Sequence, residues 1–84
     1  MILHTINKPS ALSLCKALIR DDDHVVLIEE GVYLAGQNLP GKVSVISSDM
    51  NARGLGELAN EIPRIDFAAF VEMCAEADKI CNWF

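Results

Sequence analysis

The hydrophobic pattern of the chain centres on an unbroken apolar run at residues 25–28 (VVLI). A strand without alternation of polar and apolar positions is usually covered on both faces, as in a parallel sheet with helices on either side. The turn Glu29-Glu30-Gly31 ends this run, and residues 32–35 (VYLA) begin a short helix-like segment. A strand followed by an acidic turn and a helix forms half of a βαβ unit. The pattern therefore predicts a small α/β domain organised around this strand.

Further apolar segments, each bounded by turn residues, predict the rest of the sheet. The expected strands cover residues 1–6, 24–29, 42–47, 62–65 and 79–83, of which the last could instead be a docked tail. Pro63 places the fourth strand at a sheet edge or at a strand start. No linker or repeat interrupts the chain, so residues 1–84 are expected to form a single domain. Its fold class is a three-layer α/β/α sandwich with a mostly parallel sheet of four to five strands.

Three further helical segments are expected between the strands. The apolar positions of residues 11–20 fall on one face at about 100° per residue, and Cys15 lies near the middle of that face. Residues 47–49 (SSD) offer N-caps for a short helix that Gly54 ends. The last helix begins after Asp66, its expected cap. Its shared apolar face carries Phe67, Phe70, Val71 and Cys74.

The chain is rich in apolar residues for its size. It has 84 residues, of which 51% are hydrophobic, and so short a chain buries only about 60% of the surface that its unfolded form exposes. Part of the apolar surface is therefore expected to face another subunit. The candidate contact residues are Val32, Tyr33, Leu34, Trp83 and Phe84.

Charge and cysteine content narrow the possible partners and compartment. Seven basic residues are scattered among 12 acidic ones, which gives a net charge of −5 and disfavours direct nucleic-acid binding. The start, MILHTINK, shows no signal-peptide pattern, and no apolar run reaches membrane-spanning length. Three cysteines without a framework spacing favour free thiols in a reducing cytoplasm.

Several motifs that suggest a ligand are better explained as structure. Residues 54–59 (GLGELA) match G-x-G-x-x-A, but the preceding strand ends near Ile46, whereas the dinucleotide fingerprint sits at a strand-to-helix turn. The acidic run at residues 21–23 is expected to be solvated. His4 and His24 lie at or near strand ends and have no partner at zinc-ligand spacing. We therefore expect neither a nucleotide cofactor nor a metal ion.

Cysteine is the one residue type left that could carry chemistry. Cys74 lies on the core face of its helix, where a free cysteine behaves as a small hydrophobe, and Cys81 could be exposed near the end of the chain. Periodicity alone favours a core position for Cys15. A nucleophilic thiol needs exposure and a positive neighbour that lowers its pKa, and Lys8 and Lys16 are the nearest cations in the sequence.

Four segments in order resemble the DsrH/TusB family over essentially the whole chain. They are residues 3–8 (LHTINK), 27–33 (LIEEGVY), 49–55 (DMNARGL) and 65–71 (IDFAAFV), followed by a tail with Trp83. The acidic-Gly-Val-Tyr turn and the Asp-x-x-Ala-Arg-Gly-Leu segment are fairly specific when they occur together.

The resemblance implies a subunit of a cytoplasmic sulfur-relay complex that handles persulfide sulfur without a metal or cofactor. Its partners would be DsrE/TusD-like and DsrF/TusC-like subunits in a hetero-oligomer, together with sulfur donor and acceptor proteins. One branch of the family serves 2-thiouridine synthesis at the tRNA wobble position, and the other serves dissimilatory sulfur oxidation. DsrH-type members carry a candidate sulfur-carrier cysteine in the first helix region. Cys15 occupies that place, sixteen residues before Gly31.

Three roles remain open at this point. The chain could carry sulfur on Cys15, or it could be a non-catalytic structural subunit whose partner's cysteine does the chemistry. It could also be a stand-alone small-ligand or regulatory domain of the same fold. Resemblance in fold does not decide among these roles, and neither the branch nor any enzymatic activity of the chain alone follows from it.

Overall fold

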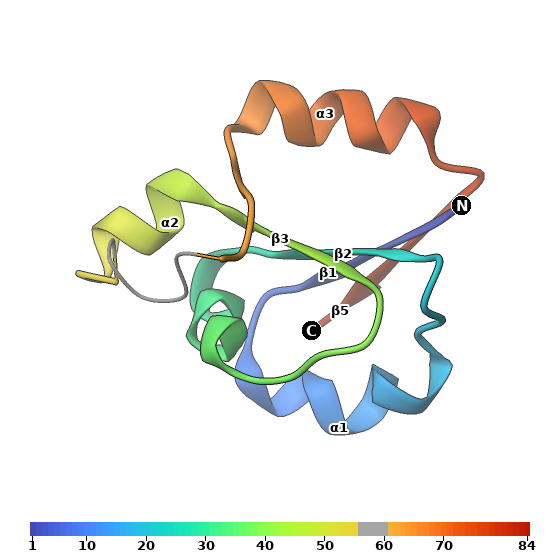
Figure 1. Ribbon diagram of the computed structural model, residues 1–84, viewed down its shortest axis with the longest axis horizontal. Helices are drawn as coiled ribbons and strands as arrows, with labels where there is room; N and C mark the ends of the chain where they lie inside the picture. The colour runs from blue at the N-terminus through green and yellow to red at the C-terminus, as the bar shows by residue number, and fades with distance from the viewer. Residues whose placement is uncertain (56–60) are drawn as a thin grey trace.

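A computed structural model describes residues 1–55 and 61–84, which form one sheet with helical layers on both sides (Figure 1). The strands are β1 (Ile2–Ile6), β2 (His24–Leu27), β3 (Lys42–Ile46), β4 (Arg64–Ile65) and β5 (Lys79–Trp83). Their order is β4-β3-β2-β1-β5, and every neighbouring pair is parallel. The predicted α/β class with a parallel five-stranded sheet is confirmed, and residues 79–83 form a strand.

Strand β2 lies in the middle of the sheet, as its unbroken apolar run predicts. Val25 and Leu27 belong to the core cluster on one face, whereas Val26 belongs to the cluster on the other face, and all three are fully buried. Alternate side chains of a strand point to opposite faces, so a strand buried on both sides needs apolar residues at every position. The strand ends at Leu27, before Glu29 turns the chain with a φ of 50°.

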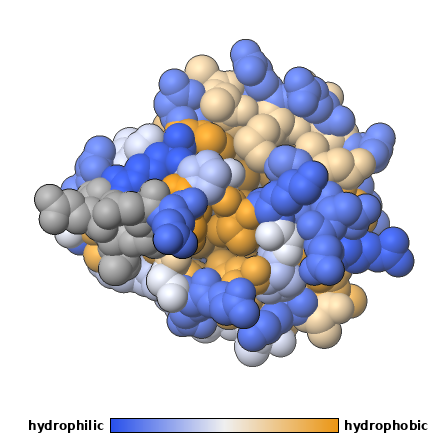
Figure 2. Space-filling model, in the orientation of Figure 1, coloured by the Kyte–Doolittle hydropathy of each residue, from blue (hydrophilic) through white to orange (hydrophobic). Residues whose placement is uncertain are grey.

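The helical segments divide unequally between the two faces. One face is covered by the 3-10 helices η1 (Pro9–Ala11), η2 (Lys16–Leu18) and η3 (Glu29–Gly36), by α1 (Leu12–Cys15) and by α2 (Ser47–Ala52). Among the described elements, α3 (Phe67–Glu76) alone packs on the other face. Figure 1 shows α3 above the sheet and α1 below it. Because one helix covers five strands, apolar residues reach the surface between the layers, seen as orange in Figure 2.

The expected continuous helix over residues 11–20 is wrong. The segment is split into η1, α1 and η2, and the backbone is already extended at Ile19. A 3-10 turn holds three residues, so the 100° spacing does not hold across the whole segment. Cys15 and Ile19 are buried with Ala11, whereas Leu14 and Leu18 remain 66% and 61% exposed. The apolar positions therefore form an inner and an outer surface.

Helix α3 begins where the sequence predicts, but its inward face differs. Asp66 Oδ1 accepts a hydrogen bond from the Ala69 backbone N–H at 2.8 Å, which confirms the cap. The face against the sheet is made by Phe70, Met73, Cys74 and Ala77. Phe67 and Val71, which periodicity places on that face, are 55% and 64% exposed. The apolar stripe is therefore wider than the part that the sheet covers.

The expected side-chain caps of α2 are absent. Ile46 is the N-cap residue, and no side chain caps this helix. Ser47 Oγ instead donates a hydrogen bond to the Ile65 carbonyl of β4 at 3.0 Å. Gly54 follows the helix with a φ of 67°, a conformation that favours glycine, so its predicted role as the stop is confirmed. Most of the G-x-G-x-x-A pattern lies in residues 56–60, outside the described residues.

The predicted subunit-contact residues separate into two groups. Val32 and Leu34 are buried in the core below the sheet, so their assignment as contact residues is wrong. Tyr33 and Phe84 are exposed, and their role stays a prediction. Trp83 is partly buried against the same core.

Candidate functional site

Cys15 ends α1 and points into the core between this helical layer and the sheet. Its side chain has 0% of its surface exposed, and its Sγ lies 3.8 Å from the Leu12 carbonyl oxygen, a weak contact. Burial raises the pKa of the Cys15 thiol, because the thiolate loses hydration, and a backbone hydrogen bond opposes this only in part. In this conformation Cys15 has neither the exposure nor the lowered pKa of a reactive thiol.

The other two thiols do not form a site with Cys15. All three cysteines are free. Cys74 packs under α3, on the face of the sheet opposite Cys15. Cys81 lies on the edge strand β5, in register with His4 of β1, and is partly exposed. The positions argue against a shared two-cysteine centre within one chain.

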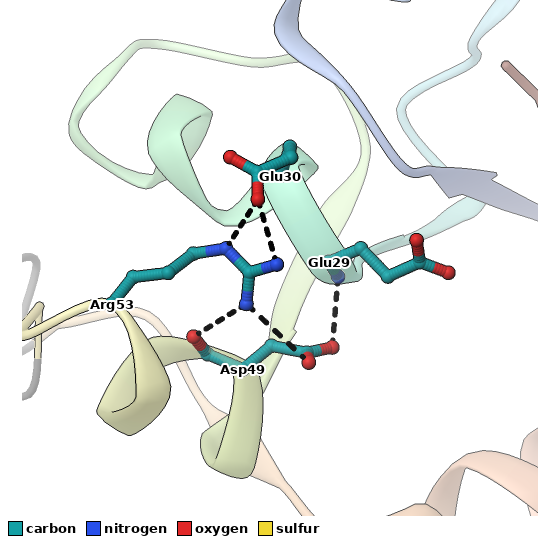
Figure 3. A network of polar contacts seen from close by, with 4 residues as sticks. All are labelled: Glu29, Glu30, Asp49 and Arg53. Atoms are coloured by element: carbon teal, nitrogen blue, oxygen red, sulfur yellow. Dashed lines mark hydrogen bonds and ion pairs between the residues drawn. The ribbon is translucent and has the colours of Figure 1, made fainter.

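The most developed polar cluster lies at the carboxyl ends of β2 and β3 (Figure 3). Arg53 Nε and Nη2 donate to Glu30 Oε1 at 2.9 and 2.8 Å, and its Nη1 donates to the Asp49 carbonyl oxygen at 3.1 Å. Asp49 Oδ2 accepts the Glu29 backbone N–H at 2.8 Å. The side chains thereby join the start of η3 to α2. We call this cluster, made of Glu29, Glu30, Asp49 and Arg53, the acidic-turn latch.

The close approach of the Ile6 carbonyl group explains why the acidic turn contains glycine at position 31. A Cβ atom at this position would lie 1.9 Å from the Ile6 carbonyl oxygen and 2.7 Å from the Ile6 carbonyl carbon. The same oxygen accepts the Ile28 backbone N–H at 3.1 Å, so β1 is held close to the turn. Glycine is therefore needed for the close approach of two backbone segments.

The charge of Arg53 is satisfied by Glu30 and Asp49, whereas Glu29 joins the latch through its backbone N–H. The hydrogen bonds to Glu30 raise the pKa of Arg53 above its usual range, and the charge of Asp49 adds to this. An arginine engaged in this way is not available as an anion-binding group. Within the described residues no group of three or more His, Cys, Asp or Glu side chains could hold a metal ion. The latch is best explained as the structural connection between η3 and α2.

A buried polar chain that sequence reasoning missed connects β1 to β5 and to the turn before β2. Trp83 Nε1 donates to His4 Nδ1 at 3.0 Å, and His4 Nε2 lies 3.0 Å from Asp23 Oδ2. Because the indole N–H can only donate, His4 Nδ1 must accept, and the hydrogen is assigned to Nε2, which faces Asp23. His4 and Asp23 are both buried.

The expectation that residues 21–23 are all solvated is therefore wrong for Asp23. Its Oδ2 also accepts the Arg20 backbone N–H at 3.0 Å. This bond first, and the bond to His4 second, hold the pKa of Asp23 below its usual range. Asp21 and Asp22 remain exposed. No local sequence signal marks which carboxylate of the run is buried, because its histidine partner lies 19 residues away.

One open pocket lies beside the turn before β2, and neither the latch residues nor His4 line it. It has a volume of about 510 Å³ and is lined by Lys16 and Asp21 and by the loop at residues 38–41. Cys15 does not line it.

In the part of the chain that is described, no helix is long and apolar enough to cross a membrane.

Residues 7–80 match the family described as DsrH like protein. The chain belongs to the DsrH-like family. The solution NMR structure of protein Tm0979 from Thermotoga maritima is 31% identical to the DsrH-like chain, with a TM-score of 0.70 over 89% of this chain and 92% of that one. The crystal structure of the ychN protein from E. coli is 15% identical, with a TM-score of 0.66 over 98% and 97% of the two chains. The second likeness shows the fold alone. None of the curated proteins matches this sequence.

The latch joins the two motifs that carry the resemblance to the DsrH-like family. The acidic-Gly-Val-Tyr turn and the Asp-x-x-Ala-Arg-Gly-Leu segment are the motifs that carry the resemblance in the sequence. The fold brings them together through the contacts of Glu30 and Asp49 with Arg53. The two motifs therefore form one structural unit of the DsrH-like chain.

Proposed function

We propose that the DsrH-like chain is a non-catalytic subunit of a cytoplasmic sulfur-relay assembly, in which a partner subunit's cysteine carries the persulfide. The partners are DsrE/TusD-like and DsrF/TusC-like subunits in a hetero-oligomer. The assembly delivers sulfane sulfur to tRNA wobble 2-thiouridine synthesis or takes part in dissimilatory sulfur oxidation. Family membership supports the sulfur-relay context.

The observation that carries the non-catalytic role is the burial of Cys15. A sulfur carrier must bring its sulfur atom into contact with a donor persulfide and then with an acceptor thiol. Cys15 is fully covered by its own chain, and burial raises the pKa of its thiol. Both properties slow the formation and the attack of a thiolate at neutral pH.

Sulfur transfer through Cys15 itself is the second candidate function. The observation that favours it is the broken structure around this residue, where one turn of α-helix lies between two 3-10 turns. Short segments of this kind open locally at lower cost than a continuous helix. In that open state the Cys15 thiolate attacks the outer sulfur of a donor persulfide and releases the donor thiolate. An acceptor thiolate then attacks the sulfur held on Cys15, which restores the Cys15 thiolate.

The test combines accessibility with transfer in the complete assembly. The assembly is purified from the native host, loaded with a persulfide donor, and the added sulfur is located by mass spectrometry of each subunit. Native-state alkylation of Cys15 is followed against pH, with the partly exposed Cys81 as the internal reference. Cys15→Ala and Cys15→Ser assemblies are then compared with the wild type for sulfur transfer.

The non-catalytic role predicts slow labelling of Cys15, no added sulfur on this subunit and full transfer by both variants. Cys15→Ala then costs only about 1 kcal/mol of folding stability through lost packing. Added sulfur on Cys15, together with loss of transfer in both variants, would overturn that role in favour of the carrier. If no DsrE-like or DsrF-like subunit co-purifies with this chain, both the non-catalytic role and the sulfur-carrier role lose their support.

A further inference from the structure

A buried histidine connects the carboxyl end of β5 to the turn before β2. His4 of β1 accepts the Trp83 indole N–H on Nδ1 and donates from Nε2 to the Asp23 carboxylate, both at 3.0 Å. His4 and Asp23 are buried, whereas Trp83 is only partly buried. A neutral imidazole has one acceptor nitrogen and one donor nitrogen, and here both are used. The neutral form is therefore the one that fits between the two partners.

A second proton on His4 removes the acceptor that Trp83 needs. An imidazolium ring donates from both nitrogens and accepts on neither, and an indole N–H can only donate. A proton on Nδ1 would therefore point at the Trp83 N–H across the 3.0 Å between the two nitrogens. The bond to Asp23, in contrast, becomes charge-assisted, which makes it about twice as strong as a neutral one. Protonation thus strengthens one contact of His4 and breaks the other.

The other attachments of the two partners decide which one moves. Asp23 is buried, and its Oδ2 also accepts the Arg20 backbone N–H at 3.0 Å. The Trp83 carbonyl oxygen accepts the Asn7 backbone N–H at 3.3 Å, which is a long bond. The Trp83 and His4 rings are stacked with centroids 6.3 Å apart, beyond the roughly 6 Å within which an aromatic face holds a cation. Trp83 is therefore the partner that moves away.

The rest of β5 has attachments that do not involve His4. At its start, the Asp78 carboxylate pairs with the Met1 ammonium group, and the Asp78 backbone N–H donates to the Met1 carbonyl oxygen at 2.9 Å. On the face of the sheet opposite His4, Thr5 Oγ1 donates to Asn82 Oδ1 at 2.6 Å. We infer that His4 is a pH-sensitive clamp, whose second proton releases Trp83 and loosens β5 at its carboxyl end only.

Histidine is the side chain whose ordinary pKa places its charge change between pH 5 and 8. The titratable groups on the same side of the sheet as His4 are Asp23, Cys81, which is in register with His4, and Cys15 of α1. The bonds to Asp23 hold its pKa below the usual range, so it stays charged, and burial raises the pKa of Cys15, so it stays neutral. The remaining charged or titratable groups of the adjoining elements are exposed or point to the opposite face: Lys16, Arg20, Asp21, Asp22, His24 and Lys79. The clamp does not depend on sulfur transfer, because it uses neither a thiol nor a partner subunit.

Solution NMR of the whole chain follows both members of the broken contact at once. The chain has two histidines and one tryptophan, so the His24→Gln variant assigns the ring signals of His4. The His4 ring signal and the Trp83 indole N–H signal are recorded from pH 8 to 5 in the wild type, Trp83→Phe and His4→Gln. A glutamine amide gains no proton in this range and still offers a donor and an acceptor, so His4→Gln is the matched control. Circular dichroism reports whether the sheet stays folded.

In the wild type and in His24→Gln, the indole N–H signal should shift with the same midpoint as protonation of His4, while the circular dichroism of the sheet stays constant. In His4→Gln the indole signal should not change with pH. Because the proton and the indole N–H compete for Nδ1, the His4 midpoint in Trp83→Phe should lie about 0.5–1 pH unit higher than in the wild type.

Four results would each overturn the inference. They are an indole signal that does not follow His4, a His4 midpoint in Trp83→Phe that is equal or lower, no protonation of His4 above pH 5, and loss of the whole sheet at the same midpoint. If Trp83→Phe does not fold, the titrations of the wild type and His4→Gln decide the question without it.

Discussion

Replacing Gly31 by alanine should strongly destabilise the DsrH-like chain. The new Cβ would lie 1.9 Å from the Ile6 carbonyl oxygen, so β1 and η3 must separate by more than an ångström to reach ordinary contact. Overpacking of this kind costs about 1–3 kcal/mol. The shift also weakens the hydrogen bond from Ile28 to the same oxygen, worth roughly 0.5–1.5 kcal/mol. Together these give a loss of about 2–4 kcal/mol, a large part of the ~5–15 kcal/mol that stabilises a typical domain.

Urea unfolding followed by far-ultraviolet circular dichroism measures this loss, and two other glycines provide matched controls. A methyl group added at Gly36 would meet no atom within 4 Å, and the position needs no left-handed backbone, so Gly36→Ala should be neutral or slightly stabilising. Gly54 also faces open space but has a φ of 67°, so Gly54→Ala should lose about 1 kcal/mol through backbone strain alone.

The order of the stability losses among the three variants tests whether steric overlap at Gly31 is the cause. Steric overlap predicts the largest loss for Gly31→Ala, a smaller one for Gly54→Ala and none for Gly36→Ala. In a domain of this size the first loss corresponds to a decrease in Tm of roughly 10–25 °C. If Gly31→Ala unfolds within about 0.5 kcal/mol of Gly36→Ala, the close approach of β1 to the turn is not as described.

Three further predictions concern the polar clusters. Trp83→Phe should lower the free energy of unfolding in urea by about 1–3 kcal/mol, because the buried His4 Nδ1 loses its hydrogen-bond donor. Tyr33→Phe, at an exposed ring, is the control and should change stability little. Equal effects of the two variants would contradict the Trp83–His4–Asp23 hydrogen-bond chain. The lowered pKa of Asp23 means that its stabilisation is present above its unfolded pKa of about 3.9 and is lost as pH falls through the lower folded value. An acid titration should show this loss in the wild type and not in Asp23→Asn, and identical profiles would contradict it. Arg53→Lys should lower the thermal midpoint at low salt, because the paired hydrogen bonds from the guanidinium to Glu30 are lost. The decrease should be smaller at high salt, since Glu30 is largely exposed and its charge is screened. A decrease that does not depend on salt would indicate lost packing instead.

The sheet could be predicted from the sequence because its signals are local. A continuous apolar run marks β2. Pro63 indicates a sheet edge or a strand start, and β4 begins directly after it at the edge of the sheet. Asp66 caps α3 through a side chain three residues from its partner, a distance at which sequence patterns are informative. Gly54 ends α2 for the same local reason.

The errors arise where a residue's partner is distant in the sequence or where an apolar position is exposed. The buried carboxylate of Asp23 is hydrogen-bonded to His4, 19 residues away. Asp49 accepts a hydrogen bond from a backbone N–H 20 residues away instead of capping its own helix. Periodicity assigned Leu14 and Val71 to the core, since it detects apolar positions and does not distinguish a core from an exposed surface. Burial of Cys15 agrees with its periodicity, whereas its role in sulfur transfer stays a prediction.

The place of β5 in the sheet has a consequence for the time course of folding. This strand pairs with β1 in register from Ile2 with Lys79 to Ile6 with Trp83, so nearly the whole chain separates the two partners. Contacts between such distant segments form slowly, because a long loop must close before any of them is made. During synthesis, residues 79–83 leave the ribosome after every other strand of the sheet, and until then β1 is an open edge that can pair with another chain. The last strand to be made is the one that protects the first.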